Sequence, residues 1–151
     1  MHTRVQEPTD LAAIRIGDYL EHGSRFRFIE RVTHFRPYAA IECAYHFTGE
    51  EPYMQDHIPN RPLMAGVLLL EGMMQAAALL YMLSTQTRKR RVIARSADGI
   101  VWHLPVQPPK QLNYHVLAIE QGDDQWAFSG RVFYAKRLMA ECRRFVGAVP
   151  R

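Results

Sequence analysis

The sequence predicts an α+β fold in which one sheet curls around a single long helix. Two observations carry this prediction. Residues 66–84 form one helical segment that is apolar on all sides, and strand patterns occur twice before it and four times after it. A helix without a polar face is buried on every side, so a sheet has to wrap it. The order of elements also excludes the βαβ alternation of a parallel sheet.

The elements before the helix are short. Residues 12–20 are expected to form a short helical turn, and the first two strands are expected within residues 25–35 and 38–49. From Ala40 to Phe47 larger apolar residues alternate with small or polar ones, which predicts a strand with one face in the core and one face out. Residues 49–61 are rich in Pro and turn formers, and they predict a loop.

Four further strand patterns follow a basic segment after the helix, in residues 91–106, 111–120, 124–136 and 137–149. Turn-forming residues separate them, including the pairs Asp98–Gly99 and Pro108–Pro109. Neither a repeat nor a linker interrupts the chain. One domain over residues 1–151 is therefore expected, long enough to bury roughly 70% of the unfolded surface.

Composition limits the class of protein. With 48% hydrophobic and 23% charged residues, disorder is not expected. Cys43 and Cys142 form no CxxC pair, which favours a reduced, cytoplasmic chain. Residues 1–10 lack the apolar core of a secretory signal. Residues 63–83 approach a membrane span in length, but an acidic side chain near a bilayer centre costs roughly 2.5–3.5 kcal/mol. Glu71 within this run therefore favours a soluble core helix.

Two titratable residues, His57 and Glu71, suggest acid–base chemistry. His57 ends a loop rich in Pro and Asn, and Glu71 is the only charged residue of the apolar helix. Two groups of different chemistry beside buried surface suit proton transfer. Each has a structural alternative, because an isolated His is usually structural and Glu71 can form a buried ion pair or hydrogen bond. Gln75 lies on the same helix face as Glu71 and either orients it or is a satisfied core amide.

The segment DHIPNRPLMAGVLLLEGMMQAA, residues 56–77, resembles the signature of the β-hydroxyacyl carrier protein dehydratases. HGSRFRFIERV (residues 22–32) and EEPYMQDH (residues 50–57) are similar to two further motifs of that family. The resemblance fades after about Trp102. Two residues depart from the pattern: Asn60 stands where the family has Gly, and Ala65 where it has Pro.

The resemblance implies a hot-dog fold, an antiparallel sheet wrapped around one central helix. It also implies dehydration of a β-hydroxyacyl thioester to the trans-2-enoyl thioester. In this mechanism His57 removes the α proton, Glu71 protonates the departing hydroxyl, and the N–H of Gly66 stabilises the carbonyl oxygen at the positive end of the helix dipole. No cofactor is expected, because the thioester itself makes the α proton acidic.

The same resemblance implies a substrate tunnel and a partner. Gln75 is one candidate lining residue of the tunnel. The other candidates are Tyr53, Met54, Leu63, Val67 and Leu68, and for these five core packing is the stronger interpretation. The partner is an acyl carrier protein with its phosphopantetheine-bound substrate. Because carrier proteins are acidic, the basic run Arg88, Lys89, Arg90 and Arg91 is a candidate docking site, against the alternative of a solvated loop. The family builds each site from two protomers, so a homodimer or a trimer of dimers is expected.

Two other functions stay open on the same fold. One is a thioesterase in which Glu71 activates water, and the other is a non-catalytic subunit that binds acyl chains. The poor match of the later strands suggests a specialised pathway such as polyketide synthesis. HExxH, CxxC, GxSxG and P-loop motifs are absent, so neither a metal site nor serine hydrolase chemistry is expected. No nucleic-acid-binding motif accompanies the basic run.

Overall fold

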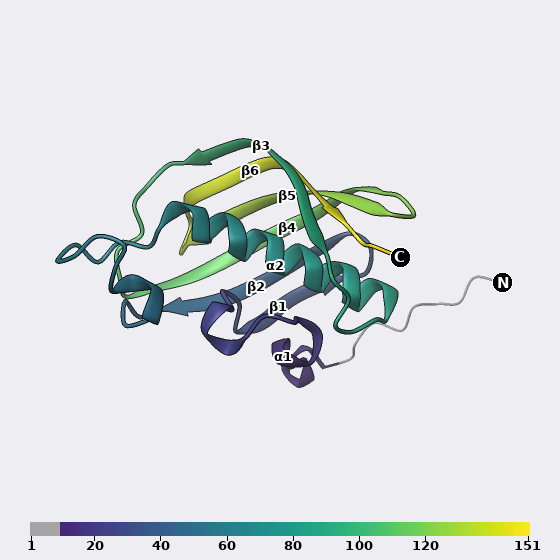
Figure 1. The fold of residues 1–151 in the computed structure, drawn as a ribbon, viewed down its shortest axis with the longest axis horizontal. Helices are drawn as coiled ribbons and strands as arrows, with labels where there is room; N and C mark the ends of the chain where they lie inside the picture. The colour runs from purple at the N-terminus through teal and green to yellow at the C-terminus, as the bar shows by residue number, and fades with distance from the viewer. Residues whose placement is uncertain (1–9) are drawn as a thin grey trace.

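A computed structural model describes residues 10–151 (Figure 1). The expectation about a secretory signal concerns residues 1–10, nearly all of which lie outside the described residues. The elements, in chain order, are the 3-10 helix η1 (Leu11–Ala13), α1 (Ile16–Tyr19), η2 (Ser24–Phe26), β1 (Arg31–Arg36), β2 (Ala40–Phe47), η3 (Pro52–Met54), α2 (Gly66–Thr85), β3 (Ile93–Trp102), β4 (Lys110–Gln121), β5 (Gln125–Tyr134) and β6 (Arg137–Ala148).

The six strands form one sheet in the order β1-β2-β4-β5-β6-β3, and every neighbouring pair is antiparallel. The strand after the helix, β3, therefore crosses to the far edge and pairs with the last strand. Figure 1 shows α2 lying across the face of the curved sheet. The predicted α+β architecture, the hot-dog fold, is confirmed.

Helix α2 occupies the centre of the core because nearly all its side chains are apolar. Its C-terminal two-thirds are buried, including Leu79 and Leu80 at 0% exposure, whereas Val67 in its first turn is 64% exposed. The helix is long and apolar enough to cross a membrane, but 61% of its most apolar 18-residue window is buried inside the protein. That burial is typical of the core helix of a soluble domain.

Several predicted boundaries shift. The turn expected at residues 12–20 divides into η1 and α1, and the strand expected from residue 25 begins only at Arg31, because Ser24–Phe26 form η2. The pair Asp98–Gly99 does not separate strands, because it lies inside β3, where Gly99 has φ +66°. Along β2 the larger apolar side chains are buried, as the predicted alternation requires. Ala44, which was expected on the face away from the core, is also fully buried.

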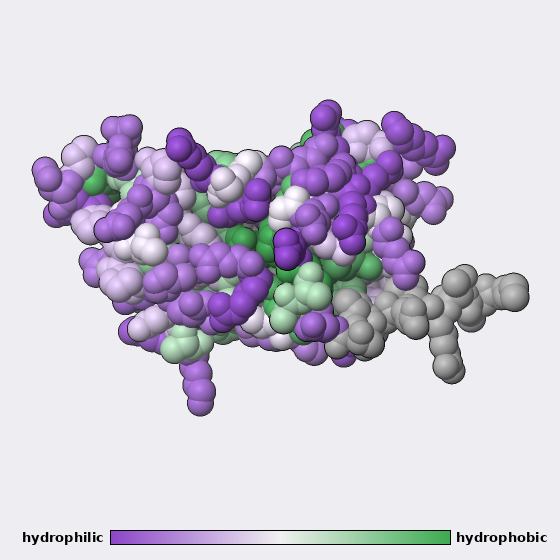
Figure 2. All heavy atoms as spheres, turned by 90° about the horizontal axis from the view of Figure 1, so that it is seen from below, coloured by the Kyte–Doolittle hydropathy of each residue, from purple (hydrophilic) through white to green (hydrophobic). Residues whose placement is uncertain are grey.

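The two sheet edges differ. The 3-10 helix η1 packs beside β1, whereas β3 has no strand on its outer side among residues 10–151. None of the ten residues of β3 is buried, and Ile93, Val101 and Trp102 are exposed apolar side chains on it. In Figure 2, which views the molecule from below, most of the surface is hydrophilic and hydrophobic residues gather near the middle. Exposed apolar residues along an open strand mark a surface suited to association.

Candidate functional site

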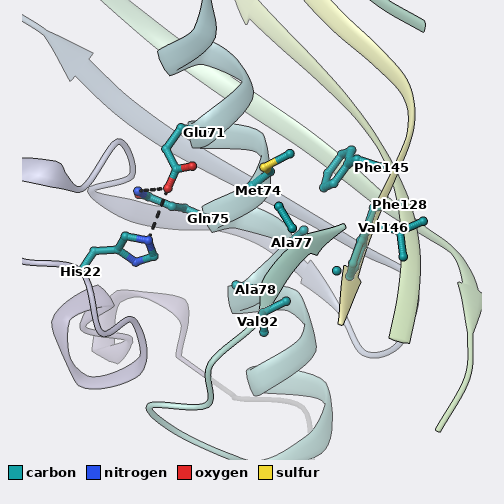
Figure 3. A pocket seen from close by; sticks show the side chains of 12 residues that line it. His22, Glu71, Met74, Gln75, Ala77, Ala78, Val92, Phe128, Phe145 and Val146 are labelled. Atoms are coloured by element: carbon teal, nitrogen blue, oxygen red, sulfur yellow. Dashed lines mark hydrogen bonds and ion pairs between the residues drawn. The ribbon is translucent and has the colours of Figure 1, made fainter. Parts of the chain in front are cut away.

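Glu71 lies at a cavity between α2 and the edge of the sheet (Figure 3). The cavity has a volume of about 190 Å³. Its polar lining consists of Glu71, Gln75 and His22. Its other lining residues are small or apolar and come from α2, the start of β3, and strands β5 and β6: Met74, Ala77, Ala78, Val92, Ala94, Phe128, Phe145, Val146 and Gly147. One carboxyl beside an apolar cavity can exchange a proton with a molecule bound there.

Gln75 fixes the position of Glu71 and joins α2 to the segment around η2. Its side-chain N–H donates to Glu71 Oε1 at 3.0 Å and to the carbonyl oxygen of Phe26 at 2.8 Å, while its own oxygen accepts from the N–H of Phe28 at 2.9 Å. Gln75 is only 1% exposed. These three bonds satisfy the amide, as a buried polar group requires. Gln75 therefore lies at the cavity beside Glu71 and is also a satisfied core amide.

His22 is a residue of the site to which the sequence assigned no role. Its Nε2 lies 3.3 Å from Glu71 Oε1. It begins the family-like segment of residues 22–32, which was the only signal in the sequence that pointed to it. Contact with Glu71 depends on tertiary folding. The apolar wall, including Phe128 and Phe145, was missed for the same reason, since it comes from strands beyond the resemblance.

His57 lies in the exposed loop before α2, and its ring is oriented by the main chain. Its Nδ1 is 2.8 Å from the carbonyl oxygen of Leu63. Because a carbonyl can only accept, Nδ1 carries the proton of the neutral ring and Nε2 keeps a lone pair. Among the contacts of residues 10–151, none joins His57 to Glu71, and His57 does not line the cavity of Glu71. One chain thus holds the two residues on separate surfaces.

Gly66 begins α2, so its N–H belongs to the first turn and has no partner within the helix. Its carbonyl oxygen accepts a hydrogen bond of 2.8 Å from Trp102 Nε1. A Cβ at position 66 would approach the Trp102 indole to 2.8 Å. Glycine is therefore needed for close packing of the indole, whether or not its N–H also binds a substrate oxygen.

The other candidate tunnel residues lie apart from the cavity of Glu71. Val67 is exposed, Leu63 and Leu68 are half-buried, and Met54 is buried beside the loop of residues 49–62. The Tyr53 hydroxyl is 3.0 Å from that of Tyr45, and its ring packs against Phe28. Burial raises the pKa of Tyr53 above its ordinary range. Within a single chain these residues do not line one shared cavity.

Both departures from the family pattern fit the local backbone. Asn60 has φ +64°, in the left-handed region where Gly is favoured and Asn is the next best tolerated residue. Ala65 precedes the first turn of α2 with φ −59°, the value to which Pro is fixed. The loop and helix start therefore keep the shape that the family residues would impose.

The basic segment after α2, residues 88–91, makes several contacts within the protein. Lys89 Nζ donates to the carbonyl oxygens of Gly17 and Leu20, and the Arg88 guanidinium lies over the Tyr19 ring. Arg91 pairs with Glu21 at 3.7 Å, and Arg90 reaches the carbonyl oxygen of Pro150 at 3.4 Å. Lys89 therefore has a structural role, while the guanidinium groups remain at the surface.

Within residues 10–151, no group of three or more His, Cys, Asp and Glu side chains is arranged to hold a metal ion. Both cysteines are buried and unbridged, and burial raises the pKa of the Cys43 thiol above its ordinary range. Neither thiol lines the cavity of Glu71. The chemistry that this site offers is therefore that of a carboxyl, an amide and an imidazole.

Comparisons with known proteins identify the family of the chain. The profile of the FabA-like domain family matches residues 20–143. The chain is 31% identical over 134 residues to the 3-hydroxyacyl-acyl-carrier-protein dehydratase FabZ of Rickettsia typhi, covering 88% of this chain and 92% of that protein. It is 27% identical over 137 residues to the FabZ of Nitratiruptor, and the match covers 87% of this chain and 93% of that protein.

Solved structures share the fold at low identity. The dehydratase heterocomplex ApeI:P of Xenorhabdus doucetiae contains a chain with TM-score 0.79 and 12% identity, covering 91% of this chain and 92% of that one. The phenylacetic acid degradation protein PaaI of Thermus thermophilus has TM-score 0.58 and 15% identity, covering 78% and 90%. At these identities the likeness concerns architecture alone.

Proposed function

The chain belongs to the FabA-like domain family, and on that premise we propose that it dehydrates β-hydroxyacyl thioesters carried on an acyl carrier protein. The product is the trans-2-enoyl thioester, and the pathway is fatty-acid or polyketide biosynthesis. One hot-dog domain, described over residues 10–151, performs the reaction. It is a hydro-lyase and uses no cofactor, because the thioester carbonyl acidifies the α proton.

The reaction uses two proton transfers. His57 Nε2 removes the α proton, and the electron pair first moves onto the thioester carbonyl as an enolate. It then forms the Cα–Cβ double bond as the Cβ–O bond breaks. Glu71 gives its proton to the departing hydroxyl, which leaves as water. The N–H of Gly66 stabilises negative charge on the thioester oxygen. His57 loses and Glu71 regains a proton by exchange with solvent before the next cycle.

One observation carries the proposal: His57 and Glu71 occur together in a chain of this family, and each has a partner suited to its role. The Nδ1 contact with Leu63 leaves Nε2 of His57 as a base. The contact of Gln75 with Glu71 holds the acid at the mouth of an apolar cavity. Thioesterase activity by Glu71 would use the same carboxyl but needs no base at position 57.

The active assembly is a homodimer or a trimer of dimers, with His57 from one protomer and Glu71 from the other. Separation of the two residues within one chain supports this arrangement. The exposed apolar residues Val67, Val101 and Trp102 also support it, and they lie where the start of α2 meets the end of β3. The substrate reaches the site on the phosphopantetheine arm of an acidic carrier protein, and the enzyme works in the cytoplasm. The tunnel residues named from the sequence line the path between protomers.

Mass spectrometry of a β-hydroxyacyl carrier protein incubated with the enzyme tests the function directly. Loss of one water from the carrier-bound substrate is the expected result. Release of the free acid would identify a thioesterase, and an unchanged substrate would identify a binding subunit. In Glu71→Gln, which keeps shape but cannot donate an acidic proton, dehydration should fall by roughly 10²- to 10⁴-fold. His57→Ala should also abolish exchange of the α proton with solvent deuterium.

A further inference from the structure

The two oxygens of Glu71 have different surroundings. Oε1 receives the side-chain N–H of Gln75 at 3.0 Å and lies 3.3 Å from Nε2 of His22. Oε2 has no hydrogen-bond partner among the described residues. Figure 3 shows both contacts converging on one side of the carboxyl. Two nitrogen atoms therefore face Oε1, which leaves Oε2 as the oxygen that can carry the proton when the carboxyl is in its acid form.

The surroundings of Nδ1 of His22 indicate whether Nε2 donates to Glu71 or accepts from it. Nδ1 of His22 is buried and has no hydrogen-bond partner among residues 10–151. A proton on Nδ1 would therefore be buried without an acceptor, which is unfavourable. The neutral ring instead carries its proton on Nε2, which is the nitrogen facing Glu71. His22 thus acts as a donor to Oε1.

His22 is held in place independently of Glu71. Its carbonyl oxygen accepts from Arg27 Nε at 3.0 Å, and its ring stacks on Phe26 with centroids 6.2 Å apart. Gln75 binds the main chain of Phe26 and Phe28 on the same segment. The imidazole and the amide that meet at Oε1 therefore belong to one rigid arrangement, which orders the carboxyl before substrate arrives.

We propose that His22 is a positioning residue for the catalytic acid. Together with Gln75 it occupies Oε1, so that Oε2–H is directed at the β-hydroxyl of the substrate. This inference rests on the proposed dehydratase function. His22 does not touch the reacting atoms. His22 has a second effect after Glu71 has given up its proton. The hydrogen bond from Nε2–H of His22 to the resulting carboxylate is then charge-assisted and therefore stronger.

Two substitutions at position 22 test the proposal. His22→Phe keeps an aromatic ring against Phe26 but removes the donor. Since the hydrogen bond to the carboxylate that forms in the reaction is lost, kcat for dehydration should fall about 10- to 100-fold with little change in KM. His22→Gln places an N–H near the same point and should restore most of kcat. His115→Phe is the matched control, because His115 pairs with Glu42 at 3.6 Å on the outer face of the sheet.

Two further measurements separate positioning from general damage. Exchange of the α proton with solvent deuterium should stay near the wild-type rate in His22→Phe, because His57 performs that step. In a Glu71→Gln background, His22→Phe should cause almost no additional loss, since the acid through which His22 acts is already gone.

The proposal is overturned if folded His22→Phe, judged by an unchanged Tm, keeps the wild-type kcat. It is also overturned if His22→Gln is no better than His22→Phe, or if the loss is the same in the Glu71→Gln background. The proposed function fails by a different result, namely a wild-type enzyme that removes no water from the carrier-bound substrate.

Discussion

At the scale of single residues, Asn60 keeps the left-handed backbone of the loop that carries His57. A β-branched residue at this φ costs about 1–2 kcal/mol. Asn60→Val should therefore lower the free energy of unfolding by that amount, while Asn60→Gly should change it by less than about 0.5 kcal/mol. Urea denaturation measures both values. Gln55→Val is the control, because Gln55 has ordinary right-handed angles in the same loop. Equal effects at the two positions would contradict the conformational explanation.

The buried tyrosines give a second prediction, for alkaline pH. Burial raises the pKa of Tyr45 from 10.0 to about 12. The unfolded chain releases this proton near pH 10 while the folded chain keeps it, so stability falls as pH rises from about 10 to about 12. Tyr45→Phe removes the group, and its Tm should decline less steeply than that of the wild type over this window. Parallel declines would show that Tyr45 titrates normally in the folded protein.

The sequence predicted some site residues and missed others for a physical reason. Glu71 and Gln75 lie one turn apart on one helix, so their proximity follows from helical geometry. His22 reaches Glu71 only because the segment around η2 packs on α2. Such a contact has no periodicity in the chain. The same holds for Phe128 and Phe145, which strand pairing brings to the cavity.

At the scale of elements, the strands and α2 were predictable from their patterns of apolar residues. Apolar residues alternate along a half-buried strand, whereas α2 is one long run that is apolar on all sides. Six strands and one long helix occur in the predicted order, although the first strand begins later than expected, at Arg31. Local turn signals were less reliable. Asp98–Gly99 reads as a turn, yet pairing with β6 continues on both sides of Gly99, where Asp98 faces Arg144 and Ile100 faces Cys142. Sheet pairing therefore overrode a local preference.

Close packing between α2 and β4 gives the prediction at this scale. A Cβ at Gly72 would lie 2.4 Å from the ring of the fully buried Tyr114. Helix propensity favours Ala over Gly by about 1 kcal/mol, but overpacking costs about 1–3 kcal/mol and more where neighbours cannot move. Gly72→Ala should therefore lower Tm. Gly23→Ala is the control, because nothing lies within 4 Å of its Cβ. A stabilised Gly72→Ala protein would show that Tyr114 moves freely.

At the scale of the whole molecule, shared sites can be tested by subunit exchange. His57→Ala and Glu71→Ala proteins are each expected to be inactive. After mixing under conditions of exchange, part of the activity should return, because one site of each hybrid dimer recovers both residues. The measurement is dehydration rate against mixing ratio. Absence of recovery in dimers that have demonstrably exchanged would place His57 and Glu71 in the same protomer's site.

Carrier docking can be tested on the surface guanidinium groups of the basic segment. Arg90→Glu with Arg91→Glu should raise KM for carrier-bound substrate, and the effect should shrink as salt is added. Activity on a short pantetheine thioester should change little. Lys89→Ala is the contrasting variant, since Lys89 binds two main-chain carbonyls and its loss should lower Tm instead. Equal losses on both substrates in the double variant would assign the arginines to the fold.

The bare edge of β3 also bears on solubility. Along it, the N–H and C=O groups that face away from β6 have no strand partner among residues 10–151, and exposed Ile93, Val101 and Trp102 lie beside them. Any extended segment can add to such an edge, including a partly folded copy of the same chain. Until the edge is covered, correct assembly competes with aggregation at this strand. Overproduction of the chain beyond its capacity to assemble should therefore yield insoluble material that begins at β3.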